Sequence, residues 1–231
     1  MNQQLTLAIQ PQQHAKLEDF IWSGNTIVQK AVENLLQRQG ERFLYIRGSA
    51  GTGKSHLLQG VCQYYLQNNL PAIYLPLSML NQLGPECLED LADQQLIALD
   101  DIEAVANNQE WEQALFALYN QIFDNNSTFL ITSSAYSVTT TPLQLMDLRS
   151  RLNWGISLQL HELADQQKIS LLQHQASSRG IFLTDAVALY IIQRATRDVH
   201  HLSGILDALD NASLSAQRKI TIPFVKQVLR L

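Results

Sequence analysis

Apolar and polar positions follow one pattern up to about residue 162 and another pattern after it. In the first part, short apolar runs predict buried strands at residues 43–47, 72–77, 95–99, 128–132 and 155–160. Stretches of helical spacing predict helices at about residues 26–39, 56–66 and 110–123. Gly40 is expected to end the first of these helices. Strands that alternate with helices indicate a parallel sheet with helices on both faces.

The second part has helical spacing only. It predicts helices at residues 164–178, 185–194, 200–217 and 222–229. At the other end of the chain, the polar residues 1–19 include Pro11 and predict a flexible arm. The sequence therefore predicts a flexible arm at 1–19, an α/β domain at 20–162 and a small helical domain at 163–231.

The link between the first strand and the helix that follows it carries a complete phosphate-binding motif. Residues 48–55 read Gly-Ser-Ala-Gly-Thr-Gly-Lys-Ser, which matches the P-loop pattern G-x-x-x-x-G-K-[ST]. Glycines let consecutive amides point at one phosphate, while Lys54 supplies a positive charge and Ser55 a hydroxyl ligand for Mg²⁺. A glycine-rich turn without a ligand is the alternative, which the flanking strand and helix disfavour. The expected nucleotide-binding residues are Gly48, Ser49, Ala50, Gly51, Thr52, Gly53, Lys54, Ser55 and His56.

Two carboxylates follow the third predicted strand, where they would face the crevice at the carboxyl edge of the sheet. Asp100 is expected to hold Mg²⁺ together with Ser55, and Asp101 to orient water. Because aspartate is one methylene shorter than glutamate, we expect Asp101 to support only slow hydrolysis. Ser134, at the end of the next strand, is the expected polar contact to the γ-phosphate or the attacking water.

Composition narrows the class of protein. The net charge of −5 argues against a dedicated surface for duplex DNA. Two cysteines suggest no disulfide framework, and no signal peptide or membrane-spanning run is recognised. We expect a cytoplasmic protein with no membrane partner and no structural metal.

Arg149 and Arg151 lie close together near the end of the α/β domain. One of them could act in trans as an arginine finger, a residue that stabilises charge on a neighbour's γ-phosphate. From residue types alone, the more ordinary interpretation is a solvated helix end with local ion pairs.

Together these motifs resemble the AAA+ ATPases, and within them the initiator DnaA and the Hda family of DnaA-homologous regulators. The resemblance covers nearly all of the chain. It is carried by Asp100–Glu103, Trp111–Asn120, Arg149–Gly155, the four-helix lid and Ala216–Lys226. It implies an adaptor that, with the DNA-loaded sliding clamp, stimulates ATP hydrolysis by DnaA and so prevents over-initiation of replication.

The resemblance also gives roles to single residues. Arg151 becomes the arginine finger acting on DnaA in trans, with Arg149 as the second choice. The segment Gln4-Leu-Thr-Leu-Ala-Ile9 is similar to the clamp-binding hexapeptide, although Ala8 departs from the usual proline. Gln4, Leu5, Leu7 and Ile9 are the expected clamp-binding residues. Contact with DNA is then expected mainly through the clamp, and a homodimer stays open.

Two positions depart from the family's nucleotide sensors. Ser134 stands where the family has an acid, and His200 stands at the sensor 2 arginine, with Arg197 nearby. Histidine is mostly neutral at cytosolic pH, so a fixed charge for the γ-phosphate is lost. We therefore expect ADP or another nucleoside diphosphate with Mg²⁺, and weak or no intrinsic ATPase activity.

Two other functions stay open. One is an autonomous P-loop ATPase that resembles a helicase loader, and the other is a structural subunit stabilised by nucleotide. The segment Gln4–Ile9 and the departures at the sensors favour the adaptor.

Overall fold

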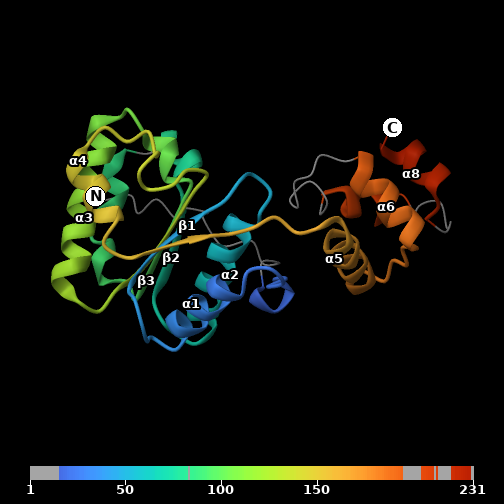
Figure 1. Cartoon of the computed structure of the whole chain (residues 1–231), viewed down its shortest axis with the longest axis horizontal. Coiled ribbons are helices and arrows are strands. Elements are labelled where there is room, and N and C mark those ends of the chain that lie inside the picture. Colours follow the sequence, from blue (N-terminus) through green and yellow to red (C-terminus); the bar gives the residue numbers. More distant parts are fainter. Residues whose placement is uncertain (1–15, 83, 195–203, 211, 213–219, 230–231) are drawn as a thin grey trace, which may run out of the picture. The chain divides into compact units, whose positions relative to one another are not determined.

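The computed structural model describes residues 16–82, 84–194, 204–210, 212 and 220–229. It divides into an α/β unit that extends to His161 and a helical unit that begins at Glu162 (Figure 1). The sequence had placed the boundary one residue later.

The α/β unit is built on a sheet of five parallel strands in the order β2-β3-β4-β1-β5. These are β1 (Phe43–Arg47), β2 (Ala72–Pro76), β3 (Leu96–Asp100), β4 (Phe129–Ser134) and β5 (Ile156–Gln159). All five residues of β3 and all six of β4 are buried, which explains why these strands have apolar runs without alternation. The predicted parallel sheet is confirmed.

Helices cover both faces of this sheet (Figure 1). On one face lie α1 (Thr26–Leu36) and α2 (Lys54–Gln67), which pack on Leu44, Ile46 and Ala98. On the other face lie α3 (Gln109–Asn125) and α4 (Met146–Leu152), which pack on the intervening strand residues such as Tyr45 and Leu130. Alternation of side chains along each strand therefore decides which layer a residue joins.

The first helix ends earlier than predicted. Helix α1 stops at Leu36, and Arg38 has a left-handed backbone with a φ of +58°. The amide of Gln39 then donates to the carbonyl of Asn34 at 2.8 Å, which completes a Schellman motif. The chain therefore reverses two residues before Gly40, and the expectation that Gly40 ends this helix was wrong.

Short 3₁₀ helices that the apolar pattern did not predict connect several elements. They are η1 (Leu17–Asp19), η2 (Leu77–Gln82), η3 (Pro85–Leu88), η4 (Leu91–Asp93) and η5 (Ile102–Val105). The first lies against α2, where a Cβ added at Gly60 would be 3.1 Å from the side chain of Leu17. Residues 16–19, which the sequence assigned to the flexible arm, thus belong to the α/β unit.

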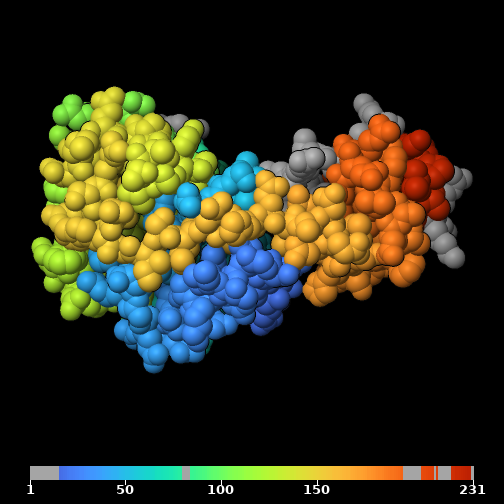
Figure 2. Space-filling view, viewed as in Figure 1, coloured from blue at the N-terminus to red at the C-terminus, as the bar shows by residue number. Residues whose placement is uncertain are grey.

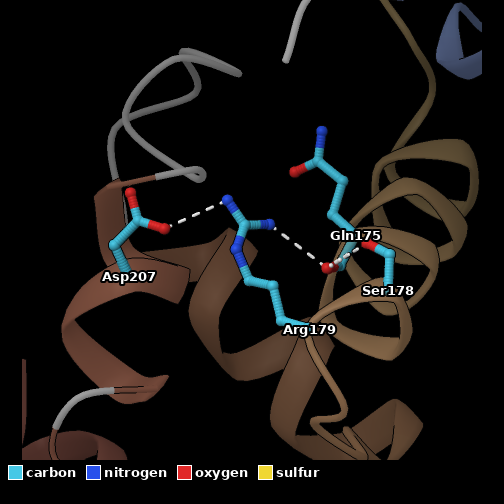
Figure 3. Close-up of polar contacts among 4 residues, drawn as sticks. All are labelled: Gln175, Ser178, Arg179 and Asp207. Carbon is cyan, nitrogen blue, oxygen red and sulfur yellow. Dashed lines mark hydrogen bonds and ion pairs between the residues drawn. The ribbon is translucent and has the colours of Figure 1, made fainter. Parts of the chain in front are cut away.

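The helical unit has its own apolar core. Helices α5 (Asp165–Ser178), α6 (Asp185–Arg194) and α8 (Ile222–Leu229) surround Leu172, Ile191 and Leu206, and residues 204–210 are also helical. Near the end of α5, Arg179 donates to the Gln175 carbonyl at 3.2 Å and pairs with Asp207 at 3.0 Å (Figure 3). Within the described residues, no helix is long and apolar enough to cross a membrane.

Candidate nucleotide site and arginine surface

The P-loop connects the end of β1 to the first turn of α2. The amide of Gly48 donates to the Ser134 carbonyl at 3.1 Å, which joins the start of the loop to β4. Gly51 and Gly53 have φ values of +80° and +94°, in the region that favours glycine. A side chain at Gly53 would also lie 3.3 Å from the ring of Phe20. The loop therefore needs glycine at this position for both backbone and packing reasons.

Lys54 is the first residue of α2, and its side chain is directed back along the loop. Its Nζ donates to the Gly48 carbonyl at 2.9 Å and to the Ser49 carbonyl at 3.3 Å. The residue is only 7% exposed. An ammonium group held at the P-loop in this way is close to the groups that would receive phosphate oxygens.

Asp100 ends β3 as a buried carboxylate, 2% exposed, with a partner on each oxygen. The Tyr74 hydroxyl donates to Oδ2 at 2.6 Å, and the Ser133 hydroxyl donates to Oδ1. Burial, followed by the nearby Asp100 carboxylate, raises the pKa of the Tyr74 hydroxyl, which therefore stays a donor. The two hydroxyls fix the orientation of the carboxylate while leaving it further acceptor capacity.

Ser133, rather than Ser134, is the serine of β4 that meets Asp100. Its hydroxyl also accepts the amide of Asp101 at 2.9 Å. The side chain of Ser134 points to the other face of the sheet, where it accepts the amide of Tyr136 at 3.0 Å. The position of Ser134 thus gives no support to its predicted contact with the γ-phosphate, because successive side chains of a strand point to opposite faces and only Ser133 faces Asp100.

Asp101 and His56 lie at the margins of the site. Asp101 has a left-handed backbone, with a φ of +56°, and starts η5. The imidazole Nε2 of His56 lies 3.2 Å from the Lys16 carbonyl, and its ring lies 5.9 Å from that of Phe20. His56 is thus positioned by the segment that precedes α1.

The residues present fit a nucleotide with Mg²⁺. Helix α2 begins without a side-chain cap and without an acidic residue in its first turn, so its amides suit an anion. The P-loop amides and Lys54 would hold phosphate groups, and Ser55 and Asp100 would serve the metal ion. Bound Mg²⁺ would supply charge neutralisation at the phosphates.

The two arginines of α4 have different surroundings. Arg149 donates to the Thr139 carbonyl at 2.7 Å and lies 3.9 Å from the sulfur of Met146. The guanidinium of Arg151 instead lies 3.7 Å from the ring centre of Trp154 and 5.5 Å from that of Phe116. The Arg151 side chain makes no hydrogen bond or ion pair within the described ranges. The donors of Arg149 are thus used within the chain, and those of Arg151 are available.

Glu112 positions this helix, and sequence analysis did not single it out. It is a buried residue of α3 whose carboxylate accepts the amides of Gln144 at 2.8 Å and Leu145 at 2.6 Å, directly before α4. It also accepts the amide of Asn107 at 3.0 Å. A glutamate at an apolar position of an amphipathic helix was the only signal in the sequence that could have found it.

Several predicted site residues lie outside the described residues. They are the clamp-binding residues Gln4, Leu5, Leu7 and Ile9, and the sensor 2 positions Arg197 and His200. Their roles stay predictions.

Two family models match the chain. The model of the bacterial DnaA ATPase domain matches residues 12–159, and the model described as "Hda, lid domain" matches residues 165–229. A relative from Haemophilus influenzae (strain ATCC 51907 / DSM 11121 / KW20 / Rd), described only as an uncharacterized protein, is 43% identical over the full length of both chains.

Solved structures share the fold at low identity. Domain III of the Thermotoga maritima replication initiation protein DnaA aligns with a TM-score of 0.79 and 18% identity, covering 94% of this chain and 95% of that chain. AMPPCP-bound DnaA from Aquifex aeolicus aligns with a TM-score of 0.73 and 21% identity, covering 89% of this chain and 68% of that chain. The family resemblance inferred from the sequence is thereby confirmed: the chain belongs to the family of the bacterial DnaA ATPase domain, as an Hda-like AAA+ protein with an Hda-type lid.

Proposed function

We propose that this chain is a regulatory adaptor that, together with the DNA-loaded sliding clamp, stimulates ATP hydrolysis by DnaA. As a member of this family it is a DnaA-related regulator of DNA replication. Its contribution to hydrolysis in DnaA is the guanidinium of Arg151, delivered in trans to the developing charge on the γ-phosphate. The proposed partners place this action in the cytoplasm.

The contrast between Arg149 and Arg151 is the observation that carries the proposal. A finger needs donors that are free to meet phosphate oxygens of another protein. Arg149 uses donors on the carbonyl of Thr139, whereas Arg151 is held only by aromatic rings among the described residues. Figure 2 shows the surrounding segment, in yellow, at the surface of the α/β unit.

The nucleotide held by this chain itself is proposed to be ADP or another nucleoside diphosphate, with Mg²⁺. The complete P-loop and the buried Asp100 support binding, while histidine at position 200 removes a fixed charge that would favour a triphosphate. Competition titrations should show ADP binding at least as well as ATP. A strong preference for ATP would contradict this part of the proposal.

The test is release of phosphate from ATP-bound DnaA in the presence of clamp-loaded DNA. Arg151→Ala should lower the stimulated rate by on the order of 10³, since trans-acting fingers contribute this much elsewhere. Arg149→Ala is the matched control and should keep most of the stimulation. Loss only with Arg149→Ala moves the finger to Arg149, and full stimulation by both variants refutes a catalytic contribution from this chain.

Clamp dependence is tested with a second variant in the same assay. Deletion of residues 1–10 should abolish clamp pull-down and clamp-dependent stimulation, because it removes the segment Gln4–Ile9. The melting temperature should stay nearly unchanged. Normal clamp binding by the truncated protein would show that this segment is not the clamp-binding site.

An autonomous ATPase is the second candidate, favoured by the intact arrangement of Lys54 and Asp100. It predicts turnover of ATP by the purified chain alone. The adaptor predicts turnover only when DnaA, clamp and DNA are all added.

A further inference from the structure

We propose that Trp154 is a positioning residue that holds the guanidinium of Arg151 in its working orientation on the surface. The inference rests on the proposed function of Arg151 as a finger. It adds a residue that does not itself touch the reacting atoms.

The distance between the Arg151 guanidinium and the Trp154 ring indicates that the two groups are stacked. The Arg151 Cζ lies 3.7 Å from the centre of the Trp154 ring, which is the contact distance of two flat groups placed face to face. The N–H donors of a guanidinium lie in its plane and point away from its face. Stacking therefore restrains the flat face of Arg151 and leaves its donor edge for a phosphate.

Trp154 is itself held in place from two directions. The ring of Phe123, on α3, lies 4.5 Å from it, tilted by 54°. The backbone of the next residue, Gly155, lies so close to β1 that an added Cβ would be 1.9 Å from the Phe43 carbonyl oxygen. The indole thus packs on α3, and the backbone directly after it is held close to β1.

The backbone also couples Trp154 to the arginine. The Trp154 amide donates to the carbonyl of Arg151 at 3.0 Å, in the turn that ends α4. The arginine and the ring that restrains it are therefore carried by one turn. This arrangement reduces the side-chain entropy that a long, free arginine would lose on meeting its target.

A purely structural tryptophan would be expected to bury more of its ring. Trp154 is 39% exposed, and Phe123 beside it is 49% exposed. The pair thus contributes less to the core than its size allows, while it supports the charged group. This exposure favours a role at the surface.

The first test measures phosphate release from ATP-bound DnaA at saturating concentrations of each variant. Trp154→Leu keeps apolar bulk without an aromatic face and should lower the maximal rate by on the order of tenfold. Trp154→Phe restores an aromatic face and should stay within about threefold of the original protein. The concentration that gives half-maximal stimulation should change little in either variant.

The second test needs neither DnaA nor activity. The Arg151 Hε resonance can be identified by its disappearance in Arg151→Ala. It should lie upfield of the usual position of arginine Hε, because of the ring current of Trp154. It should move downfield in Trp154→Leu and less so in Trp154→Phe. An unshifted resonance in the original protein would overturn the stacked arrangement in solution.

The outcomes separate this inference from the proposed function. If Arg151→Ala stimulates normally, the finger itself is refuted. If Arg151→Ala fails to stimulate but Trp154→Leu reaches the original maximal rate, only the positioning role is refuted. A Trp154→Phe variant that folds but is as defective as Trp154→Leu also refutes it. If Trp154→Leu does not fold, the Arg151 resonance of the original protein and the maximal rate of Trp154→Phe still test the positioning role.

Discussion

At the scale of single residues, hydrogen bonds distinguish side chains that look equivalent in the sequence. Ser133 and Ser134 are adjacent hydroxyls, yet only Ser133 donates to Asp100. Arg149 and Arg151 are two residues apart, yet within the described chain only the Arg149 side chain donates a hydrogen bond to a carbonyl. Each pair thus provides a functional candidate and its natural control.

The two serines should therefore differ in nucleotide binding. Ser133→Ala removes the donor that orients the Asp100 carboxylate and should weaken Mg²⁺-dependent nucleotide affinity by about fivefold. Ser134→Ala should leave this affinity unchanged, because its hydroxyl lies on the other face. Titrations with and without Mg²⁺ check both variants. Equal effects of the two substitutions would contradict the assignment of faces.

Tyr65 gives a prediction about pH. Burial raises the pKa of its hydroxyl from the usual 10.0 to about 12, and the hydroxyl donates to the Leu35 carbonyl at 2.8 Å. As pH rises from 10.0 to about 12, the unfolded chain loses this proton while the folded chain keeps it. The unfolded state then binds fewer protons, so the free energy of unfolding falls over that range and is fully retained below it.

Tyr65→Phe checks this reasoning. It should cost about 1 kcal/mol at neutral pH, because the hydrogen bond to Leu35 is lost. It should also flatten part of the alkaline decline in the free energy of unfolding. Urea denaturation at a series of alkaline pH values measures both effects. An alkaline slope as steep in Tyr65→Phe as in the original protein would show that Tyr65 does not cause it.

At the scale of elements, a buried carboxylate on α3 anchors the start of α4. A short helix of seven residues has little stability of its own, so its position depends on tertiary contacts. Leu148 and Leu152 supply apolar contacts in the core, and Glu112 adds polar ones by accepting the amides of Gln144 and Leu145. Both arginines lie on the helix whose start this anchor positions.

Removing the anchor should loosen α4. Glu112→Ala leaves the part-buried amides of Gln144 and Leu145 without their carboxylate partner and should lower the free energy of unfolding by about 1–3 kcal/mol. Hydrogen exchange should accelerate most in residues 144–152. Glu110→Ala, at an exposed position of the same helix, is the control and should change stability by less than about 0.5 kcal/mol. Similar stabilities for the two variants would argue against the anchoring role.

At the scale of the whole molecule, the α/β unit and the helical unit have separate apolar cores. Leu118 belongs to a core between the sheet and α3, whereas Leu172 belongs to the core of the helical unit. Since each core is built from residues of its own unit, the two units should unfold independently of each other.

Matched substitutions test this separation. Leu172→Ala should reduce the stability of the helical unit by about 2–5 kcal/mol and increase hydrogen exchange in α5 and α6. Amides of β3 should keep their protection. Leu118→Ala should increase hydrogen exchange in β3 and leave the amides of α5 and α6 protected. Loss of protection in β3 on Leu172→Ala would mean that the units unfold together.

Features that depend on neighbours along the chain could be predicted from the sequence. The strand and helix pattern follows from local periodicity, and the P-loop is eight contiguous residues whose glycines set the backbone directly. These features were predictable because each is specified within one element or one turn. The ends of elements were less predictable: α1 ends at a capping motif around Arg38, whose bonds the helical spacing does not specify.

The residues that meet across the sheet could not be predicted, because long-range packing brings them together. Strand order and register bring Ser133 of β4 to Asp100 of β3, and helix packing brings Glu112 to the start of α4. These partners are separated by 33 and 32 residues, so no local pattern encodes them. The same holds for Arg151, whose freedom depends on where Phe116 and Trp154 place their rings. Local backbone preferences thus defined the nucleotide loop, whereas long-range packing defined the directions of the side chains around it.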